Sequence, residues 1–307
     1  MRIAAMAAGG VGGYYGARLA AAGHDVYFIA RGAHREAMEK NGLTLERPEG
    51  NVHIAKPNVT DDPAKVGPVD IVLFAVKLWD TEKAAEATRP MVGPQTRVIP
   101  LQNGIDSTER VAPIVGIENT AAGVTYVATV IDRPGVIRQD GTFQSIIFGR
   151  VDGRPDAQLQ AFADACKAAG IAATVSNDIQ RDRWHKYIFL TATSGCTAVT
   201  RMTMGPILAD PDTRRMFLSI MRETLKVGQA RGVAIDDSYL EQRMEFADKS
   251  VPANMKASMA NDLDRGNRLE LDWLAGTVSR LGKELNVPTP VNDTIYAALK
   301  LHRMGQR

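Results

Sequence analysis

Six residues near the N-terminus have the types and spacing of a phosphate-binding turn. They read Ala8-Gly9-Gly10-Val11-Gly12-Gly13, between an apolar segment at 2–7 and a helical pattern at 14–22. At the start of a helix the backbone N–H groups are unpaired, and the helix dipole adds partial positive charge. A side chain at Gly9 would hold a pyrophosphate away, and one at Gly12 would push the helix off the strand. The turn therefore predicts nucleotide binding.

The elements around the turn support this interpretation, with one departure. Residues 2–7 and 26–30 each predict a buried strand, and Gly23 ends the helix between them, which completes a βαβ unit. Ala7 stands where the first glycine of the G-x-G-x-x-G pattern normally lies, at little cost if its backbone stays in the β region. From these glycines alone, a turn that binds nothing stays an alternative. The predicted pyrophosphate contacts are Ala7, Ala8, Gly9, Gly10, Val11 and Gly12.

Arg31 ends the second predicted strand, about 20 residues past the glycine turn, where an NAD-binding unit normally carries an acidic residue for the ribose 2′-OH. An arginine there is suited to the 2′-phosphate of NADP through a bidentate, charge-assisted contact. We expect the neighbouring His34 and Arg35 to add positive field. Residues 26–35 contain no Asp or Glu. This absence favours a role of Arg31 in NADPH binding over the alternative that it is a solvated surface arginine.

Two further strand ends carry polar side chains. Lys77 follows the apolar run 69–76, and Asn103 follows the predicted strand 97–101. The carboxyl ends of parallel strands form the ligand-binding edge of such a sheet, so we expect both side chains near the cofactor. Asn103 could donate and accept hydrogen bonds near a nicotinamide, although Asn-Gly is also a common turn dipeptide.

Residues that could do acid–base chemistry lie in the second half of the chain. Lys186, Leu190 and Ser194 are spaced to share one helix face. A lysine beside a hydride donor is a natural general acid, with its pKa lowered by burial and nearby cationic groups. Taken singly, Lys186 fits better as a helix-edge lysine with a solvated ammonium. Glu270, between two leucines and twelve residues after Ser258, is unusual for an exposed face, although most such glutamates are solvated.

The elements that must position these residues alternate strand and helix in the first half of the chain. The run 69–76 is typical of a strand buried on both faces of a parallel sheet. The other expected elements are a helix at 34–40, a hairpin at 43–46 and 52–54, a helix at 81–87, a strand at 97–101, β-rich segments over 121–148 with turns at 132–135 and 139–141, a helix at 156–168 and a strand at 172–175. This pattern predicts the α/β class, with a Rossmann-like doubly wound domain for NADP over residues 1–177.

After the helix-capping cluster Ser176-Asn177-Asp178, the pattern becomes helical almost to the end. The expected helices are 179–193, 211–228, 238–248, 258–262 and 269–281, with one more after Pro290. We therefore predict an all-helical domain over residues 178–307 for substrate binding and homodimerisation.

The composition excludes several classes of protein. A net charge of +2 is too small to indicate nucleic-acid or membrane-surface binding, and no apolar run approaches the ~20 residues of a membrane span. The two cysteines, Cys166 and Cys196, lie in apolar helical patterns, which predicts core positions and fits a reducing compartment. The five histidines show no metal-binding spacing, so no metal is expected. The first strand begins at once, leaving no room for a signal peptide, and we expect a cytoplasmic protein.

Taken together, these residues resemble the ketopantoate reductase (2-dehydropantoate 2-reductase) family over essentially the whole chain. The resemblance is carried by the glycine turn, Arg31, Val-Lys77, Gln-Asn103-Gly, Trp184-x-Lys186, Ser258-Met259 and Glu270-x-Asp272. It implies an NADPH-dependent reductase of pantothenate biosynthesis that acts on a small 2-oxo acid.

The resemblance also implies roles for individual residues. Lys186 would be the general acid, and Glu270 would bind the substrate hydroxyl and touch the cofactor. Ser258 would hold the substrate carboxylate, and Asn103 would contact both cofactor and substrate. Lys77 and, on a weaker match, Thr129 would line the cofactor site.

The chain departs from the family at three positions where the family carries asparagines that contact ketopantoate. These positions hold Leu190, Ser194 and Met204. Leu190 cannot form a side-chain hydrogen bond, so discrimination for a substrate hydroxyl would fall. Ketopantoate is the leading substrate. The alternatives are a less polar branched 2-oxo acid and a non-catalytic NADP-binding or sensing protein, although mere binding would not require Lys186 and Glu270.

Overall fold

The computed structural model describes residues 1–306 and divides into two compact units. Unit 1 comprises Met1–Gln102 and Asp106–Ile179, and unit 2 comprises Asn103–Ile105 and Gln180–Arg307, described as far as residue 306. The short segment Asn103–Ile105 belongs by its contacts to unit 2. The predicted domains, divided once at residue 177, would have put this segment in the first domain.

Unit 1 is built on a five-stranded parallel sheet in the order β5-β2-β1-β6-β7. Its strands are β1 (Arg2–Met6), β2 (Asp25–Ile29), β5 (Asn58–Thr60), β6 (Ile71–Phe74) and β7 (Arg97–Pro100). All four residues of β6 are buried, as expected for a strand covered on both faces. The carboxyl ends of β1, β2, β6 and β7 lead to the glycine turn, Arg31, Lys77 and Asn103.

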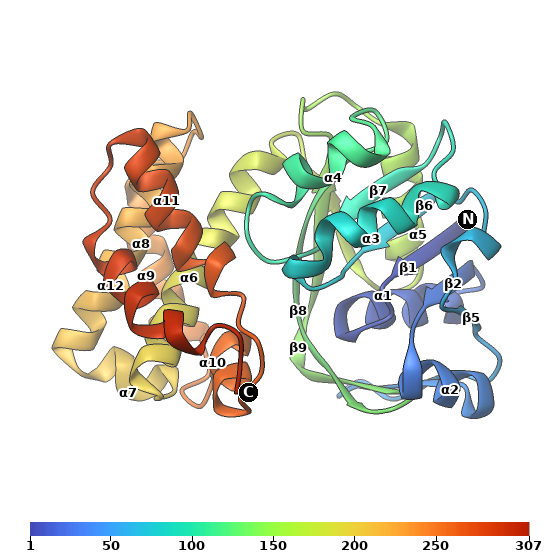
Figure 1. The fold of residues 1–307 in the computed structure, drawn as a ribbon, viewed down its shortest axis with the longest axis horizontal. Coiled ribbons are helices and arrows are strands. Elements are labelled where there is room, and N and C mark those ends of the chain that lie inside the picture. The colour runs from blue at the N-terminus through green and yellow to red at the C-terminus, as the bar shows by residue number, and fades with distance from the viewer. Residues whose placement is uncertain (307) are drawn as a thin grey trace. The chain divides into compact units, whose positions relative to one another are not determined.

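Helices cover both faces of this sheet (Figure 1). Ala4 and Met6 of β1 pack in one hydrophobic cluster with α3 (Thr81–Thr88) and α4 (Ser107–Val115), whereas Ile3 and Ala5 pack in another with α1 (Gly10–Ala21) and α5 (Ala157–Ala168). This division follows from the alternation of side chains along a strand. Helix α2 (Gly32–Asn41) follows β2, and 3₁₀ turns span Pro63–Lys65, Leu78–Asp80 and Arg89–Met91.

A second sheet in unit 1 packs against α1, which contacts strands of both sheets. Its order is β10-β9-β3-β4, and β8 pairs with β9. Its strands are β3 (Leu43–Glu46), β4 (Val52–Ile54), β8 (Ala122–Arg133), β9 (Val136–Gly149) and β10 (Ala172–Val175). The long antiparallel β8–β9 hairpin brings Thr129 to the glycine turn, as described below.

Unit 2 is helical. Its long helices are α6 (Ile179–Thr200, whose first residue belongs to unit 1), α8 (Pro211–Ala230), α9 (Ser238–Ser250), α11 (Ala275–Leu285) and α12 (Pro290–Leu299). The short ones are α7 (Met204–Ala209) and α10 (Ser258–Asp264), with 3₁₀ turns at Leu271–Trp273 and Lys300–His302. Helix α8 contacts α7, α9, α11 and α12 (Figure 1). The predicted fold class, an α/β region followed by helices, is confirmed.

Several local predictions were wrong. The turn expected at 139–141 lies inside β9, where the pairing with β8 shifts register after Val127. The single helix expected at 269–281 is a 3₁₀ turn followed by α11. Helices α4 and α7 were not anticipated. Helix α4 contains Pro113, and α7 has only six residues, so neither shows a clear helical pattern. Cys166 and Cys196 are buried in the two cores as predicted, and burial raises the pKa of each thiol to about 12.

Candidate active site

The glycine turn in unit 1 is tightly packed at Gly10 and Gly12 and open at Gly9. A Cβ on Gly12 would collide with the carbonyl oxygen of Ala7, as predicted, and one on Gly10 would lie 2.7 Å from the carbonyl oxygen of Thr129. A Cβ on Gly9 would meet no atom within 4 Å. Gly9 is the N-cap of α1 and supplies no side-chain cap, so the first N–H groups of the helix remain available as donors.

Thr129 contributes a second polar group at this turn. Its Oγ1 is buried without a hydrogen-bond partner among residues 1–306, and it would lie 3.1 Å from a Cβ on Gly10. Buried hydroxyls are normally bonded, so an orphaned one indicates a missing partner. Open space at Gly9, free helix donors and this hydroxyl fit a dinucleotide diphosphate, for which the glycine turn and Thr129 would be the contacts.

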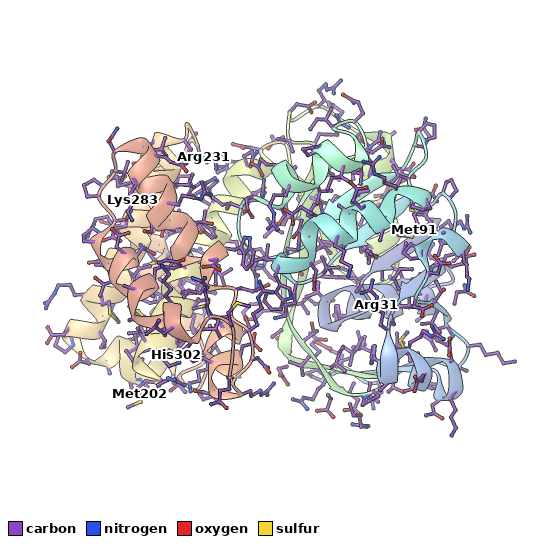
Figure 2. All side chains as sticks on the ribbon, in the orientation of Figure 1. Arg31, Met91, Met202, Arg231, Lys283 and His302 are labelled. Atoms are coloured by element: carbon purple, nitrogen blue, oxygen red, sulfur yellow. The ribbon has the colours of Figure 1, made fainter. Side chains whose placement is uncertain are left out.

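Arg31, labelled in Figure 2, is exposed at the N-cap of α2. Its guanidinium has no hydrogen bond or ion pair within the described part of the chain. The expected contribution of its neighbours to the positive field was wrong. Arg35 is paired with Glu39 and Asp61, and burial lowers the pKa of His34, which favours the neutral ring. Arg31 therefore provides the available positive charge at this end of β2.

Lys77 is exposed at the end of the β6 segment, with its Nζ 5.6 Å from the centre of the Trp79 ring. Gln102, for which the sequence predicts no separate role, holds this turn from the end of the next strand. Its Nε2 donates to the carbonyl oxygen of Val76 at 3.0 Å and lies 2.9 Å from Thr81 Oγ1. The sequence signal for this role was the polar type of Gln102, which comes directly after a buried predicted strand.

In unit 2, the side-chain amide of Asn103 joins Lys186 and Glu270. Lys186 Nζ donates to Asn103 Oδ1 at 3.2 Å, and Asn103 Nδ2 donates to Glu270 Oε2 at 3.3 Å. An ammonium only donates and a carboxylate only accepts, so these partners fix the orientation of the amide. Three residues expected to act in catalysis or binding therefore form one hydrogen-bonded group.

Buried anchors on α6 hold this group. Trp184 is buried against Gly228. Lys186 is two residues later, about 200° around the helix, and so lies on nearly the opposite side of α6 from Trp184. Tyr187 Oη lies 2.7 Å from the carbonyl oxygen of Leu274, to which it donates, so the segment after Glu270 is tied to α6. Arg183 donates to the carbonyl oxygen of Ile105 and holds the Asn103 segment. The role of Arg183 was missed, because its type and position alone do not identify its partner.

The electrostatics of Lys186 suit proton transfer. Burial lowers its pKa from 10.5 to about 8, and the Glu270 carboxylate acts in the opposite direction. The lowering of this pKa by burial agrees with the prediction. Glu270 is itself buried, at 8% exposure, unlike an ordinary solvated glutamate.

The other expected substrate residues occupy different environments in unit 2. Ser194 is buried and its Oγ has no hydrogen-bond partner among the described residues, whereas Leu190 is half-buried against the helical core. Ser258 is exposed at the start of α10, and no hydrogen bond links it to the Asn103 group within residues 1–306. Met204 is fully buried in the core, which gives its apolar character a structural reason.

Within residues 1–306 no group of three histidine, cysteine, aspartate or glutamate residues is arranged to hold a metal ion, and no helix is long and apolar enough to cross a membrane. Asp272 accepts a hydrogen bond from Tyr296 Oη at 2.9 Å, so that carboxylate binds α12.

Comparisons with known proteins identify the family of this chain. The sequence model described as "Ketopantoate reductase PanE/ApbA" matches residues 3–153, and the one described as "Ketopantoate reductase PanE/ApbA C terminal" matches residues 178–303. The chain belongs to the ketopantoate reductase family. It is 30% identical to the 2-dehydropantoate 2-reductase of Mesorhizobium japonicum, over 98% of this chain and 97% of the relative.

Other members of the ketopantoate reductase family are similarly related. The chain is 29% identical to an uncharacterised oxidoreductase of Bacillus subtilis, YkpB, over 98% of this chain and 99% of that protein. A crystal structure of a ketopantoate reductase from Ralstonia eutropha JMP134 is 32% identical, covers 99% of this chain and 98% of its own, and superposes with a TM-score of 0.89. These relatives are named as reductases or as an oxidoreductase, so the predicted family and the general class of oxidoreductase are confirmed.

Proposed function

We propose that this protein catalyses the NADPH-dependent reduction of 2-dehydropantoate (ketopantoate) to pantoate. The observation that carries the proposal is the group formed by Asn103, Lys186 and Glu270, in which a lysine with a lowered pKa is held by a neutral amide beside a buried carboxylate. A protein that only bound the nucleotide would need no such proton donor.

Lys186 is the general acid. The reduced nicotinamide, when bound, supplies a hydride to the keto carbon. Lys186 Nζ gives a proton to the carbonyl oxygen as negative charge develops there, which lowers the barrier by electrostatic stabilisation and proton transfer. Asn103 holds Nζ in place, and this positioning reduces the entropic cost of reaching the reactive geometry. Glu270 favours the protonated lysine and accepts a hydrogen bond from the substrate hydroxyl.

The two units have separate binding roles in this proposal. Unit 1 binds NADPH through the glycine turn, Thr129, Lys77 and the 2′-phosphate contact of Arg31, and unit 2 binds the oxo acid through Asn103, Lys186, Ser194 and Ser258. The free guanidinium of Arg31 favours NADPH over NADH. A homodimer in the cytoplasm stays a prediction.

A second candidate substrate is a less polar branched 2-oxo acid. Leu190 offers no hydrogen bond on the α6 face that carries Lys186 and Ser194, so this face satisfies fewer polar groups of a substrate than asparagine would. Both candidates share the same hydride and proton chemistry.

The test is the consumption of NADPH by purified enzyme with ketopantoate, 2-oxoisovalerate and larger 2-oxo acids, followed by identification of the hydroxy acid formed. Ketopantoate with the highest kcat/KM supports the proposal, and a branched acid without the terminal hydroxyl in first place supports the alternative. Tight NADPH binding without turnover of any oxo acid would favour a sensing protein.

A further inference from the structure

We propose that His34 is a positioning residue for cofactor binding, because it holds the peptide between Ala8 and Gly9 in the orientation that the phosphate-binding turn needs. The inference rests on the proposed function, since it assumes a dinucleotide at that turn. His34 lies in the first turn of α2, three residues after Arg31, and its ring is half-buried.

Both ring nitrogens of His34 are bonded to backbone groups. The N–H of Gly135 donates to Nδ1 at 3.1 Å, and Nε2 lies 3.1 Å from the carbonyl oxygen of Ala8. A backbone N–H can only donate and a carbonyl oxygen can only accept, so Nδ1 is unprotonated and Nε2 carries the hydrogen. The ring is therefore neutral, and burial, which lowers its pKa, agrees with this assignment.

This bond fixes the direction of a donor at the entrance to α1. Ala8 is held on both sides, because its own N–H donates to the carbonyl oxygen of Ile29 at 2.8 Å. In a trans peptide the carbonyl group and the following N–H point in opposite directions. By holding the Ala8 carbonyl, His34 turns the Gly9 N–H away from itself. A Cβ on Gly9 would meet nothing within 4 Å, so there is room for a ligand beside that residue.

The second bond of His34 attaches the β8–β9 hairpin to the same turn. Gly135 lies between the two strands with a φ of +77°, a value that glycine adopts readily. Earlier in β8, the main chain of Thr129 lies against Gly10. His34 thus links the glycine turn to the strand that carries the orphaned Thr129 hydroxyl. Holding these groups in advance lowers the ordering cost of cofactor binding.

Two near-isosteric variants separate the two bonds. His34→Asn keeps an acceptor near the Nδ1 position for Gly135 but loses the donor to Ala8. His34→Gln places an amide donor near the Nε2 position but loses the acceptor. We expect the Kd of NADPH, measured directly by titration, to rise about tenfold in His34→Asn and to stay within about threefold in His34→Gln. In steady-state kinetics the change in His34→Asn should appear in the KM for NADPH rather than for the oxo acid.

The control is His53→Asn, since His53 is an exposed histidine of β4 whose ring bonds Thr44 Oγ1. This variant should bind NADPH like the wild type. A Kd for His34→Asn equal to that of the wild type, or no weaker than that of His34→Gln, would overturn the positioning role while leaving the proposed function intact. Failure of the wild type itself to bind NADPH or NADH would overturn both. Melting temperatures of all variants show whether a loss of binding follows a loss of folding.

Discussion

The side-chain oxygen of Asn103 lies 3.2 Å from Lys186 Nζ, although the two residues are 83 positions apart in the sequence. Asn103 follows a strand of unit 1, yet the segment that contains it belongs to unit 2 and is held there by Arg183. A neutral amide can orient an ammonium group without adding charge that would raise its pKa. Lys186 thereby combines a fixed position with a pKa of about 8.

The pH dependence of the reaction follows from this pKa. Reduction needs protonated Lys186, so kcat/KM for the oxo acid should fall as the pH rises through about 8. The reverse oxidation needs the neutral amine and should rise over the same range. In Lys186→Arg any remaining reductase activity should no longer fall as the pH rises through about 8, because a guanidinium group does not titrate in this pH range. A pH–rate profile for reduction that stays flat between pH 7 and about 10 would argue against lysine as the acid.

Cofactor preference tests the role of Arg31. We expect the wild type to bind NADPH more tightly than NADH by about one to two decades, the value of a charge-assisted contact with the 2′-phosphate. Arg31→Ala should weaken NADPH binding by a similar factor and leave NADH binding unchanged. Arg89→Ala, at an exposed arginine paired with Glu86, serves as the control. Equal affinities of the wild type for both nucleotides would contradict this prediction.

Two glycines of the same turn should respond differently to alanine. Gly9→Ala should fold normally, since its φ of −75° suits alanine and its Cβ has open space, but it should bind NADPH at least tenfold more weakly. Gly12→Ala should lower the free energy of unfolding by about 1–3 kcal/mol, because its Cβ meets the Ala7 carbonyl oxygen. Urea unfolding and NADPH titration of both variants test this difference, and equal destabilisation would contradict it.

Leu190 tests the substrate pocket. The wild type should show only a modest ratio of kcat/KM for ketopantoate over 2-oxoisovalerate, because Leu190 adds no hydrogen bond to the one that Glu270 accepts from the terminal hydroxyl. Leu190→Asn should raise that ratio by supplying a second partner for this hydroxyl. Leu301→Asn is the control, because Leu301 is 92% exposed. A wild-type ratio in the thousands would show that Glu270, together with backbone groups or water, already satisfies the hydroxyl without a side-chain partner at position 190.

Local sequence patterns predicted most of the fold. The continuous apolar run around 71–74 predicts a buried strand, and this strand is found as β6. The glycine-rich sequence predicts a turn into a helix, and this turn is found at the start of α1. The register shift in the β8–β9 hairpin depends on cross-strand pairing, so the dipeptide Asp140-Gly141 alone wrongly indicates a turn. Helix α4 was missed because Pro113 within it reads locally as a helix breaker.

The candidate site was predicted as residues but not as an arrangement. Asn103 and Glu270 are 167 positions apart, and no spacing rule connects them. The sequence also suggested a charged His34, whereas its two backbone partners require a neutral ring. Residue type suggests what a side chain can do, and its partners in the fold decide its protonation state and role.

The proposed function depends most on Lys186 as the proton donor. Lys186→Ala should bind NADPH with wild-type affinity but turn over its best oxo acid about 10²–10⁴-fold more slowly, the range typical for loss of a positioned acid. Lys283→Ala, at an exposed lysine of α11, should retain wild-type kinetics (Figure 2). The direct measurement is kcat for NADPH oxidation at saturating cofactor and oxo acid in these two variants and the wild type. A Lys186→Ala enzyme that turns over at a near wild-type rate would show that Lys186 is not the general acid.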